Sequence, residues 1–326
     1  MRRNCKIFVQ VLDFLCGLLY NRENNFIYPE ETSMLFVIEN DLLKVSVDSC
    51  GCEIVSIVGK KDDTEYVWGG NTEFWAQHAP TMFPICGRLQ DGKYTYRGKT
   101  YEMNLHGFAR HAEFTIAEKT PTSISMTLTD NEAIYATYPF HFAFTITHTL
   151  DGETVRTDYK VENKSDVPMP YAVGGHPGYN LPLGGKGSFT DCYIEFDTVA
   201  PVRKLVLTER CLMTEDTVEF PLIDGTKLDL HHGLFDNDAI FLVDMAKGVT
   251  LKSKVSDKFV AMKYDDMKYL GLWHKPLTEA PYMCIEPWTS VPAYDGKVDD
   301  LETKRDLAHL GAGETAYLGY SITIGQ

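Results

Sequence analysis

The sequence lacks the glycine-rich loops with which proteins bind nucleotides. No G-x-G-x-x-G run opens a helix and no Walker loop occurs, so neither a dinucleotide nor a nucleoside triphosphate is indicated as a ligand. The G-x-S-x-G elbow of serine hydrolases is also absent. No CxxC pair exists, and Cys50-Gly51-Cys52 is too tightly spaced for an ordinary zinc knuckle. No motif therefore predicts a metal or an organic cofactor.

Positive charge is scarce. The 326 residues contain 31 Lys and Arg against 46 Asp and Glu, which gives a formal net charge of -15. A surface this acidic repels phosphate backbones and anionic lipid head groups. We therefore expect no nucleic-acid partner and no membrane partner, whereas neutral ligands such as sugars remain compatible with the charge.

Disulfides are not expected either. The eight cysteines are scattered through a long chain, and a chain of this length can build a core without a disulfide framework. We interpret most of the cysteines as reduced core thiols of a cytoplasmic protein.

The first 33 residues lack a membrane span, and a signal peptide is the weaker alternative for them, although Arg2 and Arg3 precede an apolar run. The apolar run from Ile7 to Tyr20 is interrupted by Asp13 and is too short to cross a bilayer, and no small-residue cleavage site follows it. We interpret residues 1–33 as an N-terminal extension outside the main fold, with Met34 as the alternative, native start. Residues 34–326 are expected to form one domain, since no low-complexity linker divides them.

Helical periodicity is nearly absent from this domain. Strict alternation in Ser123–Thr129 and Phe142–His148 predicts β-strands, and Arg97-Gly98-Lys99 predicts the turn of a hairpin. Further strands are predicted at residues 35–38, 43–47, 155–161, 239–243, 249–251, 259–264, 269–273, 282–285 and 316–324. Only residues 302–310 are predicted to be helical, with Gly311 as the stop. This pattern predicts an all-β fold of stacked antiparallel sheets with few short helices.

Two loops place a histidine among glycines. In Leu105–Arg110, His106 precedes Gly107, and glycine permits close approach of the backbone to a ligand. The alternative is a loop with a surface histidine. In Gly174–Asn180, glycines and a proline constrain the backbone around His176, which favours a loop built for function. The alternative there is a tight turn whose histidine faces solvent.

A carboxylate ends an apolar strand in the last quarter of the chain. Glu286 follows Met283-Cys284-Ile285, and partial burial raises the pKa of such a group, which improves it as a base. Trp288 offers a flat apolar face suited to sugar C–H groups. The alternative for Glu286 is a strand-end side chain in contact with solvent.

Arg88 and the remaining histidines are weaker candidates. Arg88 either donates a fork of hydrogen bonds to hydroxyls or forms a structural salt bridge. His231 and His232 are neighbours, and neighbours on a strand point to opposite faces, so they do not bind one metal together. His141 and His148 are expected to be structural.

Taken together, these motifs resemble the aldose 1-epimerase (galactose mutarotase) family. His106–Arg110, Gly175-His176-Pro177 and Cys284–Trp288 occur in the order of that family and at about its spacing. The resemblance covers Met34 to Gln326 and is closest to the branch whose members often accompany lactose and galactose operons. It implies a galactose mutarotase-like β-supersandwich.

The resemblance also implies roles for individual residues. The implied roles are general base for Glu286, general acid for His176, contacts to sugar oxygens for His106 and Arg88, and contacts to sugar hydroxyls for Asp238 or, alternatively, Asp236. Typical galactose mutarotases have an Asn where Gly175 stands. This departure leaves the identity of the sugar open.

The expected activity is interconversion of the α and β anomers of a hexose such as galactose or glucose, without metal or cofactor, by a monomer or homodimer. A histidine with a pKa near 6.5 and a carboxylate near 4.3 would share the proton transfers at neutral pH. Two alternatives keep the fold: a hexose-6-phosphate 1-epimerase, and a non-catalytic carbohydrate-binding protein. A glycoside hydrolase ranks last, because it would need two carboxylates astride the bond.

Overall fold

The computed structural model describes residues 33–198, 202–244 and 246–325. This part of the chain is mostly β, in antiparallel sheets, as the alternation predicts. Its one α-helix is α2 (Glu132–Thr137), which the side chain of Asn131 caps by accepting a hydrogen bond from the Ile134 N–H. Among the described residues, no helix has the length and apolar character needed to cross a membrane.

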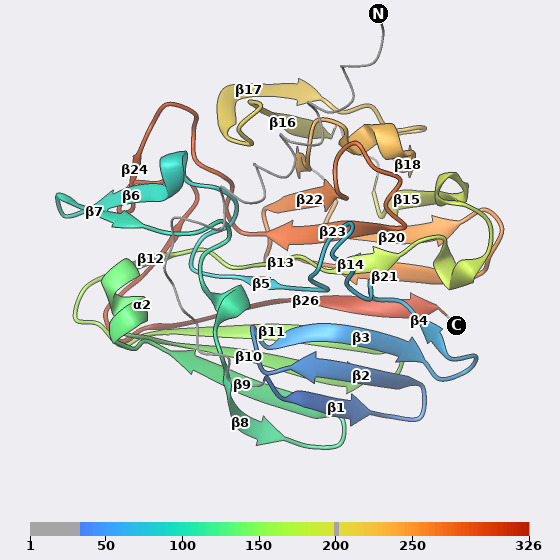
Figure 1. The fold of residues 1–326 in the computed structure, drawn as a ribbon, viewed down its shortest axis with the longest axis horizontal. Coiled ribbons are helices and arrows are strands. Elements are labelled where there is room, and N and C mark those ends of the chain that lie inside the picture. The colour runs from blue at the N-terminus through green and yellow to red at the C-terminus, as the bar shows by residue number, and fades with distance from the viewer. Residues whose placement is uncertain (1–32, 199–201, 245, 326) are drawn as a thin grey trace, which may run out of the picture. The chain divides into compact units, whose positions relative to one another are not determined.

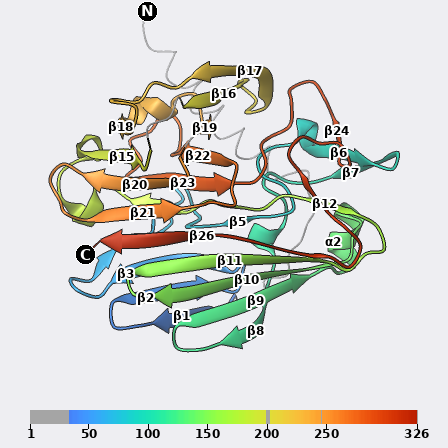
Figure 2. The same cartoon turned by 180° about the vertical axis from the view of Figure 1, so that it is seen from behind.

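The largest sheet has nine strands and carries the clearest alternation (Figures 1 and 2). In spatial order its strands are β18 (Lys227–Asp229), β15 (Cys192–Phe196), β20 (Gly248–Ser253), β21 (Phe259–Lys263), β26 (Thr315–Gly325), β11 (Thr154–Asn163), β10 (Phe142–Asp151), β9 (Ser123–Thr129) and β8 (Thr115–Lys119). Along β9 and β10, apolar side chains on one face are buried, while Ser and Thr hydroxyls pair across the strands on the other.

The second sheet has eight strands and positions the candidate site (Figure 1). It contains β17 (Met213–Glu219), β16 (Arg203–Leu207), β19 (Ile240–Val243), β22 (Tyr269–Trp273), β23 (Tyr282–Trp288), β13 (Gly174–Gly175) and β5 (Thr81–Met82) in that order, with β14 (Gly178–Asn180) also paired to β23. All 7 residues of β23 are buried, as in a strand that is covered on both faces.

Three smaller sheets complete the described fold. The four-stranded sheet has β1 (Leu35–Glu39), β2 (Leu43–Asp48), β3 (Glu53–Gly59) and β4 (Thr64–Glu65); the three-stranded sheet has β24 (Asp299–Asp300), β6 (Lys93–Tyr96) and β7 (Lys99–Glu102); the two-stranded sheet has β12 (Met169–Tyr171) and β25 (Ala308–Leu310). The predicted hairpin around Gly98 is the β6–β7 pair.

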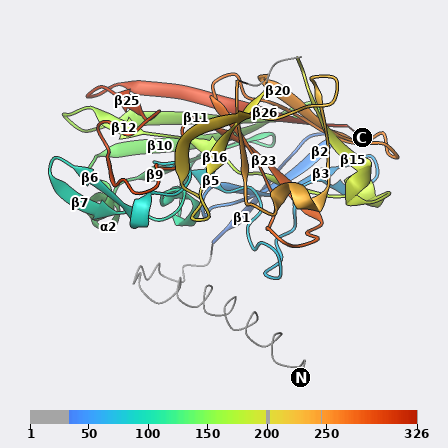
Figure 3. The ribbon, with the colours of Figure 1, turned by 90° about the horizontal axis from the view of Figure 1, so that it is seen from above.

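The sheets stack in layers, as Figure 3 shows from above, and a large apolar core lies between them. Phe83, which follows β5, stacks on Phe144 of β10 with ring centroids 4.4 Å apart. The hydroxyl of Tyr159 on β11 donates to the Gly174 carbonyl of β13. His148 of β10 is buried and contacts the Cys52 carbonyl, 3.0 Å from Nε2, which ties the four-stranded sheet to the nine-stranded one. His148 is therefore structural, as predicted.

The predicted helix at residues 302–310 is wrong. The segment forms turns and then β25, in which Leu310 pairs with Met169 of β12. The Lys304 side chain is buried and donates to the Val291 carbonyl at 2.8 Å. Tertiary contacts of this kind override a helical propensity that is worth only a fraction of a kcal/mol per residue.

The cysteines of the described residues are all free thiols, as predicted: Cys50, Cys52, Cys86, Cys192, Cys211 and Cys284. Cys5 and Cys16 lie outside the described residues, as does the predicted N-terminal extension except for Ser33.

Candidate active site

One cavity of about 330 Å³ gathers the polar residues that the sequence singles out. Its lining residues are Trp75, Gly87, Arg88, Leu105, His106, Arg110, His176, Leu207, Cys211, Asp238, Ala239, Phe241, Trp273, Glu286, Trp288 and Pro292. Every predicted site residue is among them: Arg88, His106, His176, Asp238, Glu286 and Trp288. A concave, largely apolar pocket with a few convergent polar groups is the usual form of a small-molecule site.

His176 is fixed opposite β23 by hydrogen bonds on both sides of its loop. β13 pairs with β23 before it, through Gly174 and Trp288, and β14 pairs with β23 after it, through Gly178 and Cys284. The His176 N–H donates to the Pro80 carbonyl at 3.0 Å. The preceding Gly175 is required by packing, because a Cβ there would lie 2.8 Å from the Tyr320 ring. The glycines thus allow close sheet-to-sheet contact at the site.

Glu286 lies inside β23 rather than at its end, which corrects the strand prediction. The strand continues to Trp288, and the Glu286 side chain is 1% exposed. Its partner across the ladder is Gly271 of β22, where a Cβ would come 3.1 Å from the Glu286 Cβ. Glycine at this position therefore leaves room for a carboxyl group within the sheet layer.

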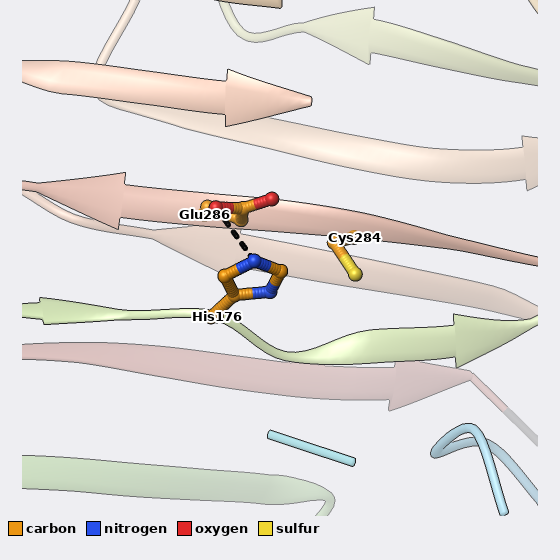
Figure 4. A group of neighbouring side chains, drawn as sticks. All are labelled: His176, Cys284 and Glu286. Atoms are coloured by element: carbon orange, nitrogen blue, oxygen red, sulfur yellow. Dashed lines mark ion pairs between the residues drawn. The ribbon is translucent and has the colours of Figure 1, made fainter. Parts of the chain in front are cut away.

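His176 and Glu286 contact each other directly (Figure 4). His176 Nε2 lies 3.3 Å from Glu286 Oε2. Burial, followed by the nearby charge of Asp238, raises the pKa of Glu286 well above its ordinary value, although Trp288 and Arg110 act in the opposite direction. Burial, followed by the charge of Arg110, lowers the pKa of His176 to about 3.

These directions correct the ordinary pKa values that the sequence suggests for this pair. Burial disfavours a charge on either residue, so it favours the state in which the one mobile proton of the pair is on the carboxyl group. Burial thus favours a neutral acid beside a neutral imidazole.

His106 is held in one orientation and one tautomer. The backbone N–H of His106 donates to the Gly87 carbonyl at 3.0 Å, and the ring atom Nδ1 accepts from the Gly87 N–H at 3.0 Å. Burial, followed by the charge of Arg110, lowers the pKa of His106 well below its ordinary value, so the imidazole is neutral. Because Nδ1 is an acceptor, the ring proton is on Nε2, and His106 can act as a hydrogen-bond donor from that atom.

The backbone at His106 depends on the next residue. Gly107 has φ +77°, and a Cβ there would lie 2.1 Å from the Phe83 carbonyl oxygen. The Phe108 N–H donates to the same carbonyl at 3.0 Å. Glycine is thus required at this position by both conformation and space.

Unsatisfied polar atoms are concentrated at the cavity. Arg88 Nε, His176 Nδ1, Glu286 Oε1 and Trp288 Nε1 are buried, and they find no hydrogen-bond partner among the described residues. Buried polar groups normally have partners, since leaving one unpaired costs about 1–3 kcal/mol. A ligand with several hydroxyl groups would supply both donors and acceptors here.

The structure separates the two candidate aspartates. Asp238 lines the cavity, whereas Asp236 is exposed and does not. The carboxylate of Asp238 is held on both sides, because Oδ1 accepts from the Ala239 N–H at 2.8 Å and Oδ2 accepts from the Cys211 thiol at 2.6 Å. Burial and the Asp238 carboxylate raise the pKa of Cys211 to about 12, so this thiol remains a donor at neutral pH.

Replacing Cys211 with alanine should therefore weaken sugar binding more than turnover. The donor to Asp238 is lost, and a hydrogen bond to a charged group is worth about 1.5–3 kcal/mol. We expect KM to rise about tenfold with kcat little changed. Cys211→Ser is the matched control, because its hydroxyl restores a donor and should return KM toward the wild-type value. A parallel loss of kcat in both variants would contradict this positioning role.

Sequence reasoning missed the aromatic walls of the cavity. The Trp75 ring lies 4.9 Å from the His176 ring at 32°, and the Trp273 ring lies 5.7 Å away at 78°. Trp288 packs edge-on against His106 and on Phe241. No short motif surrounds Trp75 or Trp273, so only the fold reveals that their rings flank a histidine far along the chain.

The remaining histidines lie outside the cavity. His78 contacts the Trp68 carbonyl through Nδ1 and has a structural role. His141 pairs with Asp130 near the end of the sheet, in agreement with its predicted structural role. His232 contacts His274, at 3.2 Å between ring nitrogens.

One group of side chains at the cavity has the donor set of a metal site. A ring nitrogen of His176, Cys284 Sγ and a carboxylate oxygen of Glu286 all lie within 4.8 Å of one another (Figure 4).

Comparison with known proteins identifies the family. Residues 34–295 match the family model described as aldose 1-epimerase. The chain belongs to the aldose 1-epimerase family. It is 31% identical over 300 residues to the plasmid-encoded protein LacX of Lactococcus lactis subsp. lactis, covering 89% of this chain and 99% of LacX.

Solved structures of other family members share the fold. A galactose mutarotase related enzyme from Lactobacillus acidophilus matches with a TM-score of 0.85 and 34% identity, over 90% of this chain and 98% of that one. A galactose mutarotase-like protein from Lactobacillus casei ATCC 334 matches with a TM-score of 0.85 and 29% identity, over 90% of this chain and 100% of that one. The predicted galactose mutarotase-like fold is confirmed.

Proposed function

We propose that this family member is an aldose 1-epimerase that interconverts the α and β anomers of a free hexose such as glucose or galactose. The observation that carries the proposal is the His176–Glu286 contact of 3.3 Å at the wall of a cavity rich in unpaired polar atoms. Ring opening requires one proton to leave O1 and another to reach O5. Both oxygens are bonded to C1, so the two protein groups must also lie close together, as they do here.

Catalysis is assigned to the pair as a unit. Glu286, as the carboxylate, accepts the proton of O1, and His176, as the imidazolium, donates a proton to O5, so the C1–O5 bond breaks and the free aldehyde forms. Rotation about the C1–C2 bond then presents the other face of the carbonyl group, and the reverse proton transfers close the ring. This form differs from the neutral pair by one proton transfer along the Nε2–Oε2 contact. Sugar hydroxyls that donate to Glu286 Oε1 would stabilise the carboxylate and so favour that transfer. His106, donating from Nε2, and Arg88, through its unpaired Nε, would orient the sugar.

A non-catalytic binding protein is less consistent with the site. Binding a neutral sugar needs hydrogen-bond donors and acceptors but no titratable pair, and burying the Glu286 carboxyl group costs stability. The measurement that tests the proposal is polarimetry of freshly dissolved α-D-glucose and α-D-galactose. Faster relaxation to the unchanged equilibrium rotation supports it, and spontaneous rates with both sugars would contradict it.

A phosphorylated hexose is the second candidate, because two guanidinium groups, Arg88 and Arg110, line the cavity. Burial favours the neutral form of Glu286, which leaves Asp238 as the opposing carboxylate. Locally the site therefore favours an anionic group more than the net charge of -15 suggests. Competition by glucose 6-phosphate against glucose mutarotation distinguishes the two substrates, since tight competition favours the phosphorylated sugar and its absence favours the free one.

The pH dependence should follow the shifted pKa values rather than ordinary ones. The free enzyme needs one mobile proton on the pair, and His176 does not take up a second proton until the pH approaches about 3. We therefore expect kcat/KM to persist below pH 4.3, where an ordinary carboxylate would lose activity, and to fall at alkaline pH as Glu286 ionises. In NMR titrations, the His176 imidazole should remain neutral from pH 8 to 5. A His176 titration near pH 6.5 would contradict the assignment.

A further inference from the structure

His176, Cys284 and Glu286 combine three kinds of metal-binding donor in one buried place (Figure 4). We propose that this group binds a soft divalent cation such as Zn²⁺, and that the bound ion inhibits the enzyme by occupying the proton-transfer pair. The inhibitory half rests on the proposed function, whereas the binding half does not.

The backbone holds the three donors in place. Cys284 and Glu286 are two positions apart on β23, so their side chains lie on the same face of the strand. Gly178 of β14 pairs with Cys284, and the Ile285 N–H donates to the Pro177 carbonyl at 3.2 Å. The loop that carries His176 is thus attached to β23 directly beside both other donors.

The distances fit a first-row ion after small side-chain rotations. The three donor atoms lie within 4.8 Å of one another, and His176 Nε2 is already 3.3 Å from Glu286 Oε2. Zinc bonds of about 2.0–2.3 Å in tetrahedral geometry place donor atoms about 3.3–3.8 Å apart. Glu286 Oε1 is buried without a hydrogen-bond partner, so a carboxylate oxygen is available to a ligand.

The donor set selects the kind of ion. An imidazole, a thiolate and a carboxylate suit Zn²⁺ or Co²⁺, whereas Mg²⁺ and Ca²⁺ prefer six or more oxygen ligands. Three protein ligands leave a fourth position open, and His176 and Glu286 both face the cavity, from which an ion or a water molecule can enter.

Inhibition follows because the ion would occupy the lone pairs that the proposed catalysis uses. The cation would bind the lone pairs of His176 and Glu286 that proton transfer requires, and the protons of the Glu286 carboxyl group and the Cys284 thiol would be released to solvent. Arg110 also acts electrostatically on both residues and disfavours a further cation, so the thiolate of Cys284 must supply much of the affinity. Removing this sulfur is therefore the sharpest test.

Binding is measured first with Co²⁺ as the spectroscopic probe, because a cobalt–thiolate bond gives a near-ultraviolet charge-transfer band. The full-length protein should show this band, and Cys284→Ser should lose it. Cys211→Ser removes the thiol that lines the cavity and Cys192→Ser removes a buried thiol on β15, so both variants should keep the band. Circular dichroism checks folding, and Cys284→Ala serves as a second variant if the serine variant does not fold.

Inhibition is measured next by polarimetry with Zn²⁺, and each variant is referred to its own rate without metal. We expect the Zn²⁺ concentration for half inhibition to rise at least tenfold in Cys284→Ser and to stay unchanged in Cys211→Ser. A cobalt–thiolate band that survives in Cys284→Ser, or that disappears in Cys211→Ser, overturns the site. Equal inhibition by Mg²⁺, or Zn²⁺ inhibition that is unaltered by Cys284→Ser, overturns the inhibitory role. If the wild type accelerates no sugar, the cobalt band still decides whether the site exists.

Discussion

Replacing Glu286 with glutamine should lower the rate of anomer interconversion by about 10³-fold while leaving the fold intact. Glutamine keeps the shape of the side chain but cannot exchange a proton, and a well-placed acid or base contributes about 10²- to 10⁴-fold. His176 then has no partner with which to share the mobile proton across the 3.3 Å contact. The measurement is polarimetry with saturating sugar, since loss of a proton-transfer step lowers kcat.

The same variant should change the pH dependence of stability. Burial raises the pKa of Glu286 in the folded protein above its unfolded value. The wild type is therefore progressively destabilised as pH rises above the unfolded pKa, because unfolding releases the proton. Glutamine has no proton to release. The unfolding free energy of the variant minus that of the wild type should therefore be larger at pH 8 than at pH 4.

Glu162→Gln on β11 is the control for the rate. Glu162 pairs with Lys160 and Lys164 outside the cavity, so this variant shows the effect of a Glu-to-Gln change that leaves the candidate site unaltered. It should keep the wild-type rate. A near-wild-type rate in Glu286→Gln would remove Glu286 from the mechanism, whatever its effect on stability.

Much of the fold is predictable from alternation because one face of each long strand is buried. Ser123–Thr129 is β9 residue for residue, and Phe142–His148 lies within β10. The pattern does not predict the edge strand β17 (Met213–Glu219), which has three exposed acidic positions and no apolar period. A strand that is held mainly by backbone pairing with β16 leaves little hydrophobic signal.

The candidate site is predictable in its residues but not in its electrostatics. His106, His176 and Glu286 stand out because glycines or an apolar strand surround them in the sequence. Burial beneath other sheets shifts the pKa of all three residues. Arg110, which is distant in the chain from His176, lowers the pKa of that residue further, whereas Asp238 raises the pKa of Glu286 further. The same holds for Cys211, whose contact with Asp238 joins two loops that no local pattern relates.

Replacing His176 with glutamine should also lower the rate by about 10²- to 10⁴-fold. The amide nitrogen of glutamine reaches roughly the position of Nε2, so hydrogen bonding to Glu286 can persist while proton transfer cannot. His148→Gln is the matched control, because His148 is likewise a buried histidine, with its pKa lowered by burial to about 4, but lies outside the cavity. Polarimetry should show that only His176→Gln loses activity.

Both histidine variants should resist acid better than the wild type. The folded-state pKa of His176 is about 3, below the unfolded value near 6.5, so stability is full above pH 6.5 and is lost as pH falls. Between pH 6.5 and 4, each such histidine costs the folded state about 3 kcal/mol. Urea unfolding at pH 4.5 and 7.5 should therefore show a smaller acid loss in both variants. If His148→Gln shares the stability change and keeps its rate, the activity lost in His176→Gln comes from proton transfer and not from altered folding.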